Sequence, residues 1–277
     1  MKLRSLICLV LIAVLTSAVA LPTTAEARRS RSSVSGDPGG HTNRGVKYAR
    51  NKEYAKAIEE FTKAIEAQPK DPKNYRNRAL SYRLSGQAEK ARADYAKAIE
   101  LNPEASSSRV ERARLFLRDK KTGAALKELD QVLASNPRDE SALRLRAFVY
   151  LQQKKWEKAI ADYTVAINSI PKVDIEGRTR RGFAYRSLKK YDLALEDFTK
   201  VIEAQPKDIE AYRRRAYLYR LMGQNEKAAA DLGKVLKLKP DDADAKSRLE
   251  FVQNMKPAKV KASPAPKAKA SPSPAKR

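Results

Sequence analysis

The stretch that decides the fold is residues 72–103, which read PKNYRNRALSYRLSGQAEKARADYAKAIELNP. In its first half, Tyr75, Ala79 and Tyr82 follow one another at spacings of four and three, which places them on one face of a helix. A serine–glycine pair at 85–86 breaks this helix, and a second apolar face follows it. The final proline closes the stretch, because the residue before a proline avoids helical geometry. The stretch therefore predicts two antiparallel helices of about 14 residues each.

The same pattern recurs along the chain with a fixed period. The prolines that end each stretch follow one another at intervals of 34, 34, 34, 35 and 34 residues. Neither helix of one stretch can bury its apolar face alone, so the core has to come from stacking one stretch on the next. The period therefore predicts six stacked units, which end at Pro69, Pro103, Pro137, Pro171, Pro206 and Pro240.

These units resemble the tetratricopeptide repeat family, whose pattern runs W-x2-L-G-x2-Y, then A-x3-F, then P. The first unit carries Gly45, Tyr48 and Phe61 at the matching places, and the third unit matches least well. The resemblance covers roughly three quarters of the chain. It implies an all-α fold, a right-handed superhelical solenoid of six helix-turn-helix units over residues 41–242. A C-terminal capping helix is expected over residues 243–255.

An arginine on the first helix of every unit is followed sixteen residues later by an acid on the second helix. Six pairs at one separation predict guanidinium–carboxylate contacts within or between units. A catalytic pair is needed only once, so this repetition indicates a structural role. Exposed pairs contribute about 0–1 kcal/mol each, so we expect them to fix the register of the helices more than to supply stability. The pairs are Arg44–Glu60, Arg78–Asp94, Arg112–Glu128, Arg146–Asp162, Arg181–Asp197 and Arg215–Asp231.

The resemblance also implies that the first helices line a concave groove where partners bind. The side chains expected to face this groove lie one position beyond the packing row, where arginines interleave with apolar residues, most densely in units five and six. Such a surface suits an extended acidic peptide or a C-terminal carboxylate. The alternative is a solvated, charge-rich helix face. The candidates are Arg76, Arg83, Arg144, Phe148, Arg180, Phe183, Arg186, Arg213, Arg214, Tyr217 and Arg220, and the third unit offers Val110, Arg114 and Leu117 at these places.

One known binding mode of the family is not matched. Certain tetratricopeptide domains hold chaperone tails with a two-carboxylate clamp of Lys and Asn from three consecutive units. Here the third unit has Ser107 and Glu111 where the clamp requires basic residues. The sequence therefore does not support binding of chaperone tails.

The N-terminal residues 1–27 have the pattern of an export signal. Lys2 and Arg4 precede an apolar run, and two A-x-A sites permit cleavage after Ala20 or Ala27. The run is shorter than the roughly 20 apolar residues that cross a bilayer. We therefore expect a periplasmic or secreted protein that begins with a flexible basic leader, residues 28–40. An uncleaved membrane anchor is the alternative, because the arginines after the run oppose translocation.

The C-terminal residues 256–277 consist mainly of Lys, Ala, Pro and Ser and contain no acid, so we expect them to be disordered. Together with a formal net charge of +25, this tail supports an alternative function. It would bind a polyanion, namely an envelope polymer, an anionic membrane surface or nucleic acid. The contact candidates are Lys256, Lys259, Lys261, Lys267, Lys269, Lys276 and Arg277.

Residue types that carry catalysis and metal binding are scarce. The only cysteine, Cys8, lies in the export signal, and the only histidine is His41. No Gly-rich phosphate loop or cluster of metal ligands occurs in the sequence. We therefore expect no catalytic site, no metal, no cofactor and no small-molecule substrate. The leading hypothesis is a non-enzymatic scaffold that binds another protein, with an acidic segment of the partner in the groove.

Overall fold

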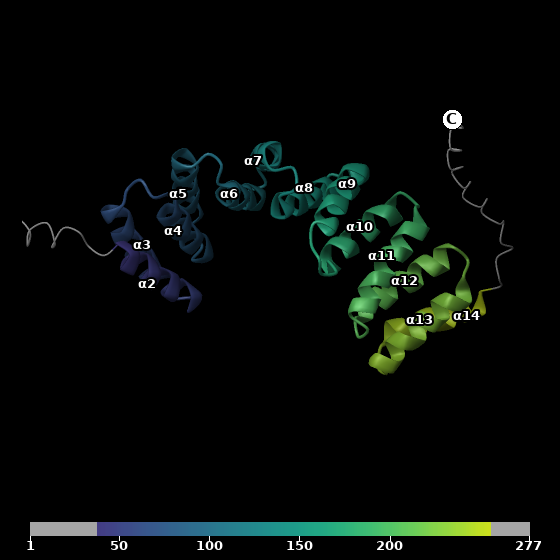
Figure 1. Ribbon diagram of the computed structural model, residues 1–277. Coiled ribbons are helices and arrows are strands. Elements are labelled where there is room, and N and C mark those ends of the chain that lie inside the picture. The colour runs from purple at the N-terminus through teal and green to yellow at the C-terminus, as the bar shows by residue number, and fades with distance from the viewer. Residues whose placement is uncertain (1–37, 256–277) are drawn as a thin grey trace, which may run out of the picture. The chain divides into compact units, whose positions relative to one another are not determined.

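The computed structural model describes residues 38–255, and every regular element in this range is a helix (Figure 1). The range contains thirteen helices and no strand, so the all-α prediction is confirmed. None of these helices is both long and apolar enough to cross a membrane. The predicted export signal and C-terminal tail lie outside the described residues. The chain divides into two compact units, Met1–Asp94 and Tyr95–Arg277, and each is described by itself.

The helices alternate between the first and second members of six pairs, as the 34-residue period predicts. The first helices are α2 (Pro38–Arg50), α4 (Pro72–Leu84), α6 (Ser106–Arg118), α8 (Glu140–Gln152), α10 (Ile175–Ser187) and α12 (Ile209–Leu221). The second helices are α3 (Tyr54–Ala67), α5 (Ala88–Leu101), α7 (Thr122–Ser135), α9 (Trp156–Asn168), α11 (Tyr191–Ala204) and α13 (Asn225–Leu238), and a single helix, α14 (Ala243–Asn254), follows them.

Helix α2 corrects the predicted start of the first unit. It begins at Pro38, inside the range 28–40 that was expected to be a flexible leader. Proline suits the first position of a helix because its fixed φ is already helical and its missing N–H would have no partner there. The right-handed superhelical course of the whole array stays a prediction.

The turn inside each pair passes through the left-handed region of backbone conformation. Glycine adopts a positive φ easily, but four of the six turns place a lysine there. From the sequence, only the turn at the serine–glycine pair 85–86 was recognised. The six residues with positive φ are Lys52 (64°), Gly86 (84°), Lys120 (59°), Lys154 (57°), Lys189 (59°) and Gly223 (72°).

Most first helices begin at an aspartate whose side chain accepts a hydrogen bond from a backbone N–H of the first turn. These caps satisfy N–H groups that have no partner within the helix. In the third unit Ala105 stands at this place and offers no side-chain cap, which agrees with the weak match of that unit. The capping residues are Asp71, Asp139, Asp174, Asp208 and Asp242.

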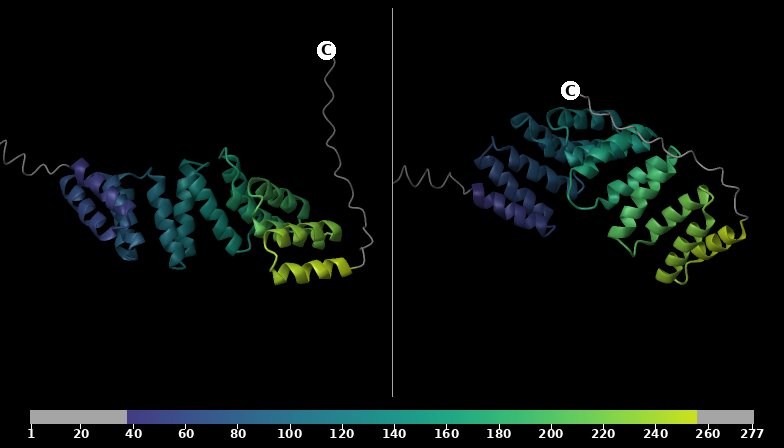
Figure 2. Two further views of the ribbon diagram at one scale, coloured as in Figure 1. Left: turned by 90° about the horizontal axis from the view of Figure 1, so that it is seen from below. Right: turned by 45° about the vertical axis from the view of Figure 1, so that its right-hand side comes forward.

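The core of each pair is built from small residues on one helix and a large apolar residue on the other. In the first pair, the ring of Phe61 packs so closely against Gly45 that an added Cβ would lie 2.6 Å from Phe61 Cε1. At the C-terminal end, α14 packs on α13 through Ala245 and Val252, which are buried. Figure 2 shows α12, α13 and α14 side by side. The last helix therefore covers apolar surface of the last pair.

The predicted contacts between arginine and acid are present in all six pairs, with N–O distances between 2.6 and 2.9 Å. Several of these arginines also reach the preceding pair, as Arg181 does by donating to Thr164 Oγ1 at 3.0 Å. The expectation that the pairs are exposed is wrong for five of the six. The five acids from Asp94 to Asp231 are buried, and Asp197 is only 1% exposed. Only Arg44 of the first pair has a side chain that is half exposed.

Candidate functional site

The predicted groove residues all lie on first helices, but they do not all play the same part. Arg76 and Arg83 lie on α4, in the unit Met1–Asp94, where both are half-buried. The other nine lie on α8, α10 and α12, in the compact unit Tyr95–Arg277. Val110 of the third unit is not a groove residue. It is 3% exposed and belongs to the core around Leu129, because its place on α6 faces the neighbouring helices.

Two of the candidate arginines connect one pair to the next. A guanidinium nitrogen of Arg144 lies 2.7 Å from Asp174, the capping residue of α10, and Arg213 contacts Asp242, the capping residue of α14, in the same way. Both aspartates are buried, so these ion pairs hold the start of each following helix. Their geometry indicates a structural role for these two arginines, although both also border pockets.

Two further candidates pair with acids of their own helix. Arg180 lies 2.7 Å from Glu176, and Arg214 lies 4.0 Å from Glu210. The guanidinium of Arg180 also stacks over the ring of Phe148, with 4.8 Å between its central carbon and the ring centre. This contact joins α10 to α8.

Arginine and aromatic side chains alternate along α10, α12 and α14. The guanidinium of Arg186 lies 3.9 Å from the ring centre of Phe183 and 5.5 Å from that of Tyr217. That of Arg220 lies 5.0 Å from Tyr217 and 6.0 Å from Phe251. We call these five residues the arginine–aromatic row. Each of these contacts holds a guanidinium near a ring by cation–π attraction.

The two arginines of this row retain donors for a ligand. Within residues 38–255, no carboxylate lies within ion-pair distance of Arg186 or Arg220. A guanidinium carries five N–H donors in its plane, and stacking on a ring occupies only its faces. Phe183 and Phe251 are 41% and 55% exposed. The row therefore presents fixed positive charge and apolar surface to solvent.

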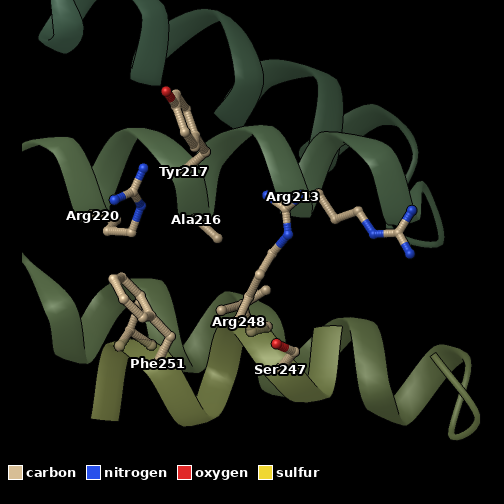
Figure 3. Close-up of a pocket in the computed structure, with 9 residues that line it drawn as sticks. Arg213, Ala216, Tyr217, Arg220, Ser247, Arg248 and Phe251 are labelled. Atoms are coloured by element: carbon tan, nitrogen blue, oxygen red, sulfur yellow. The ribbon is translucent and has the colours of Figure 1, made fainter. Parts of the chain in front are cut away.

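A pocket of about 260 Å³ lies between α12 and α14 beside this row. Its apolar wall includes Ala216, Leu232 and Val252. Three arginines, two aromatic residues and a serine line the rest, namely Arg213, Arg220, Arg248, Tyr217, Phe251 and Ser247. Figure 3 shows Arg220 and Phe251 facing each other across the pocket, whereas Tyr217 points away from α14. Such a pocket can take an apolar side chain while the arginines hold nearby anions.

Phe251 was missed in the sequence analysis, although a signal for it exists. Phe148, Phe183 and Tyr217 occupy the same place in successive units, and one further step of 34 residues from Tyr217 reaches Phe251. The sequence pattern of residues 243–255 predicts a helix that covers the core, and only the 34-residue step places Phe251 beside the groove. The row therefore extends one helix beyond the six units.

The part of the chain from Pro38 to Met255 contains no group of three or more His, Cys, Asp or Glu side chains placed to hold a metal ion. The groups that converge on the row are guanidinium donors and aromatic rings. Such groups bind carboxylates and apolar side chains.

Models of one family match most of the chain. Models described as tetratricopeptide repeat match residues 38–71, 72–105, 110–172, 175–208 and 198–230. No curated protein sequence matches the chain.

Solved structures with the same fold include YrrB, described as a TPR protein with an unusual peptide-binding site. It is 24% identical, with a TM-score of 0.60, over 69% of this chain and 97% of YrrB. The C-terminal part of a TPR repeat-containing protein from Cytophaga hutchinsonii is 19% identical, with a TM-score of 0.63, over 76% and 84%. A tetratricopeptide repeat protein from Parabacteroides merdae is 21% identical, with a TM-score of 0.56, over 78% and 99%. At these identities the likeness shows the fold alone.

Proposed function

The chain belongs to the tetratricopeptide repeat family, and on this premise we propose that it binds an extended acidic segment of a partner protein along α10, α12 and α14. The fold is that of a protein-interaction scaffold, which is typically not an enzyme. The observation that carries the proposal is the arginine–aromatic row, whose two arginines have no carboxylate partner in the described part of the chain, residues 38–255.

The row favours an acidic ligand over a neutral one for a physical reason. An unpaired guanidinium that is already fixed by stacking loses little side-chain entropy when it binds a carboxylate. A charge-assisted hydrogen bond is about twice as strong as a neutral one. Arg186 and Arg220 occupy the same place on consecutive first helices, so an extended chain that crosses both helices meets them in turn.

The aromatic members of the row suggest that the segment is also partly apolar. Phe183 and Phe251 are exposed, and the pocket beside Phe251 has an apolar wall. An apolar side chain that enters this pocket would bury surface worth about 25 cal/mol per Å². The ligand that fits best therefore alternates carboxylate and apolar side chains.

Binding of labelled peptides tests this function. The probe is a fluorescein-labelled decapeptide of alternating Glu and Leu, acetylated and amidated, and the comparison is the same peptide with Gln in place of Glu. We call them the glutamate peptide and the glutamine peptide. Fluorescence anisotropy at an ionic strength of about 0.15 M should show at least tenfold tighter binding of the glutamate peptide.

Two double variants separate the row from net charge. Arg186→Gln with Arg220→Gln should weaken binding of the glutamate peptide about tenfold or more. Arg138→Gln with Lys207→Gln removes the same charge from exposed sites off the row and should change the affinity by less than about twofold. Equal losses in both variants, or equal affinity of the full chain for the two peptides, would refute the proposal.

The alternative function, polyanion binding, rests on charge and on the basic tail 256–277. The tail lies outside the described residues, so the support for this alternative is its seven basic and no acidic side chains. Deletion of residues 256–277 distinguishes the two functions. Loss of all binding on deletion, together with a steep dependence on salt, favours the polyanion function. Binding of the glutamate peptide that survives deletion favours the row.

We also propose that the protein acts outside the cytoplasm, as the export signal in residues 1–27 predicts. The mass of the N-terminal peptide of the native protein tests this. Cleavage after Ala20 or Ala27 supports export into the periplasm or the medium. An intact N-terminus favours the membrane-anchored alternative.

A further inference from the structure

A second pocket, of about 250 Å³, lies among α6, α8, α9 and α10. Tyr163 of α9 lines it together with Phe148 and Leu145 of α8. We call it the Tyr163 pocket. It adjoins the stacked pair of Phe148 and Arg180, and it lies on the first helices one unit before the arginine–aromatic row.

Within residues 38–255 the hydroxyl of Tyr163 has no hydrogen-bond partner, although the residue is only 1% exposed. A buried polar group without a partner destabilises a protein, so such a group needs an explanation. The equivalent residues of four other units are Phe61, Leu129, Phe198 and Leu232, which fill this place without a hydroxyl. The packing of a repeat therefore does not require the hydroxyl of Tyr163.

This hydroxyl is a buried donor that lies beside arginine–carboxylate pairs. Burial raises its pKa well above the ordinary range, so it stays protonated at neutral pH. Arg114, Arg144 and Arg180 line the same pocket, and Glu176 is the one acid among the lining residues. Glu176 is engaged by Arg180 at 2.7 Å. Arg144 lies 2.7 Å from Asp174, and Arg114 lies 3.3 Å from Glu111. Among the groups that line the pocket, the Tyr163 hydroxyl is therefore a donor without such a partner within residues 38–255.

We propose that the Tyr163 pocket binds one carboxylate of the acidic segment, with the Tyr163 hydroxyl donating to a carboxylate oxygen at its base. Arg114 and Arg180 supply charge at the rim, and Leu145 and Phe148 pack against the methylenes next to the carboxylate. This inference rests on the proposed function, because the same bound segment would occupy both the row and the pocket.

Two sources of the carboxylate are distinguished by the peptides. The glutamate peptide is amidated and carries only side-chain carboxylates. A glutamine peptide with a free C-terminus carries only the terminal one. Tighter binding of the first peptide assigns the pocket to a Glu side chain, and tighter binding of the second assigns it to a chain terminus. We call the peptide that binds more tightly the preferred peptide, and it is the probe for the Tyr163 variant below.

The variant Tyr163→Phe removes only the hydroxyl and gives two opposite expectations. The affinity for the preferred peptide should fall about tenfold or more, the typical loss for a hydrogen bond to a charged group. The midpoint of thermal unfolding without peptide should stay the same or rise by about 1–3 °C, because an unpartnered buried hydroxyl is removed. The matched control is Tyr95→Phe, which removes the equivalent hydroxyl in the second repeat and should leave the affinity unchanged.

Failure of this inference can be told from failure of the proposed function. If the full chain binds neither the glutamate peptide nor the free-terminus glutamine peptide better than the amidated glutamine peptide, the proposed function falls and the pocket loses its ligand. If the chain binds and Tyr163→Phe binds equally well, only the pocket inference is overturned. Arg114→Gln is a second test of the pocket. The Arg114 side chain is exposed, so its replacement should leave the fold intact and lower the affinity for the preferred peptide about threefold.

Discussion

Replacement of Asp197 by Asn tests the role of the arginine–acid pairs. Asp197 is 1% exposed, and its carboxylate accepts hydrogen bonds from Arg181 at 2.7 and 2.9 Å and from Arg178 at 3.1 Å. Asparagine keeps the shape of the side chain but removes the charge and one acceptor oxygen. Arg181 is only 12% exposed, so its guanidinium would lose most of its compensation.

The size of the effect follows from burial. Breaking a buried ion pair by removing one partner costs about 3–5 kcal/mol, and we expect about 3 kcal/mol here because one acceptor remains. The matched control is Glu60→Gln, in which the partner Arg44 is 49% exposed and water replaces the lost contacts. For this pair, whose arginine is half exposed, we expect a smaller loss than for Asp197→Asn, of about 1 kcal/mol.

The assay is urea unfolding of the full chain at pH 7, followed by far-UV circular dichroism. Repeat arrays unfold in parts, so native-state hydrogen exchange should accompany it and show faster exchange in α10 and α11 for Asp197→Asn. If Asp197→Asn lowers the free energy of unfolding by less than about 0.5 kcal/mol, or by no more than Glu60→Gln, the buried pairs do not stabilise the array as argued.

Three further predictions concern the turns, the close packing and the pH dependence. Lys154→Gly should stabilise the chain by about 1 kcal/mol in thermal unfolding, because φ is 57° at this turn. Gly45→Ala should destabilise it by about 1–3 kcal/mol through overlap with Phe61, whereas Gly233→Ala, with open space around it, should stabilise it by about 0.5–1 kcal/mol. Burial raises the pKa of Glu60, but hydrogen bonds from its arginine and histidine partners outweigh burial and hold this pKa at about 2 instead of 4.5. Its contribution to stability is thus present above pH 4.5 and lost as the pH falls toward 2, and Glu60→Gln should abolish that part of the acid dependence.

The helix pairs and the arginine–acid contacts were predictable from the sequence because both follow the period of the repeat. A residue that recurs every 34 positions occupies the same place in every unit, so one correct assignment serves for all. The exposure of the pairs was not predictable in this way. It depends on how closely the helices pack around an acid such as Asp197, which the spacing of residues in the sequence does not show.

The candidate site was predicted in part. The sequence identifies which arginines share a helix face, but it does not show which of them have an acid of the next unit within reach. The structure shows that Arg144 and Arg213 contact the capping aspartates of the following helices, while Arg186 and Arg220 stack on rings and have no such partner. The Tyr163 pocket also escaped the sequence, since tyrosine and phenylalanine fit the repeat pattern equally well.

The most direct test of acidic-segment binding is photo-crosslinking of the full chain with a glutamate peptide that carries a benzophenone at its centre. Mass spectrometry of the digested product locates the attachment. Binding at the arginine–aromatic row predicts crosslinks in α10, α12 and α14, concentrated near Phe183, Tyr217 and Phe251. It also predicts their loss in Arg186→Gln with Arg220→Gln. Crosslinks confined to residues 256–277, or to the second helices α11 and α13, would contradict the account.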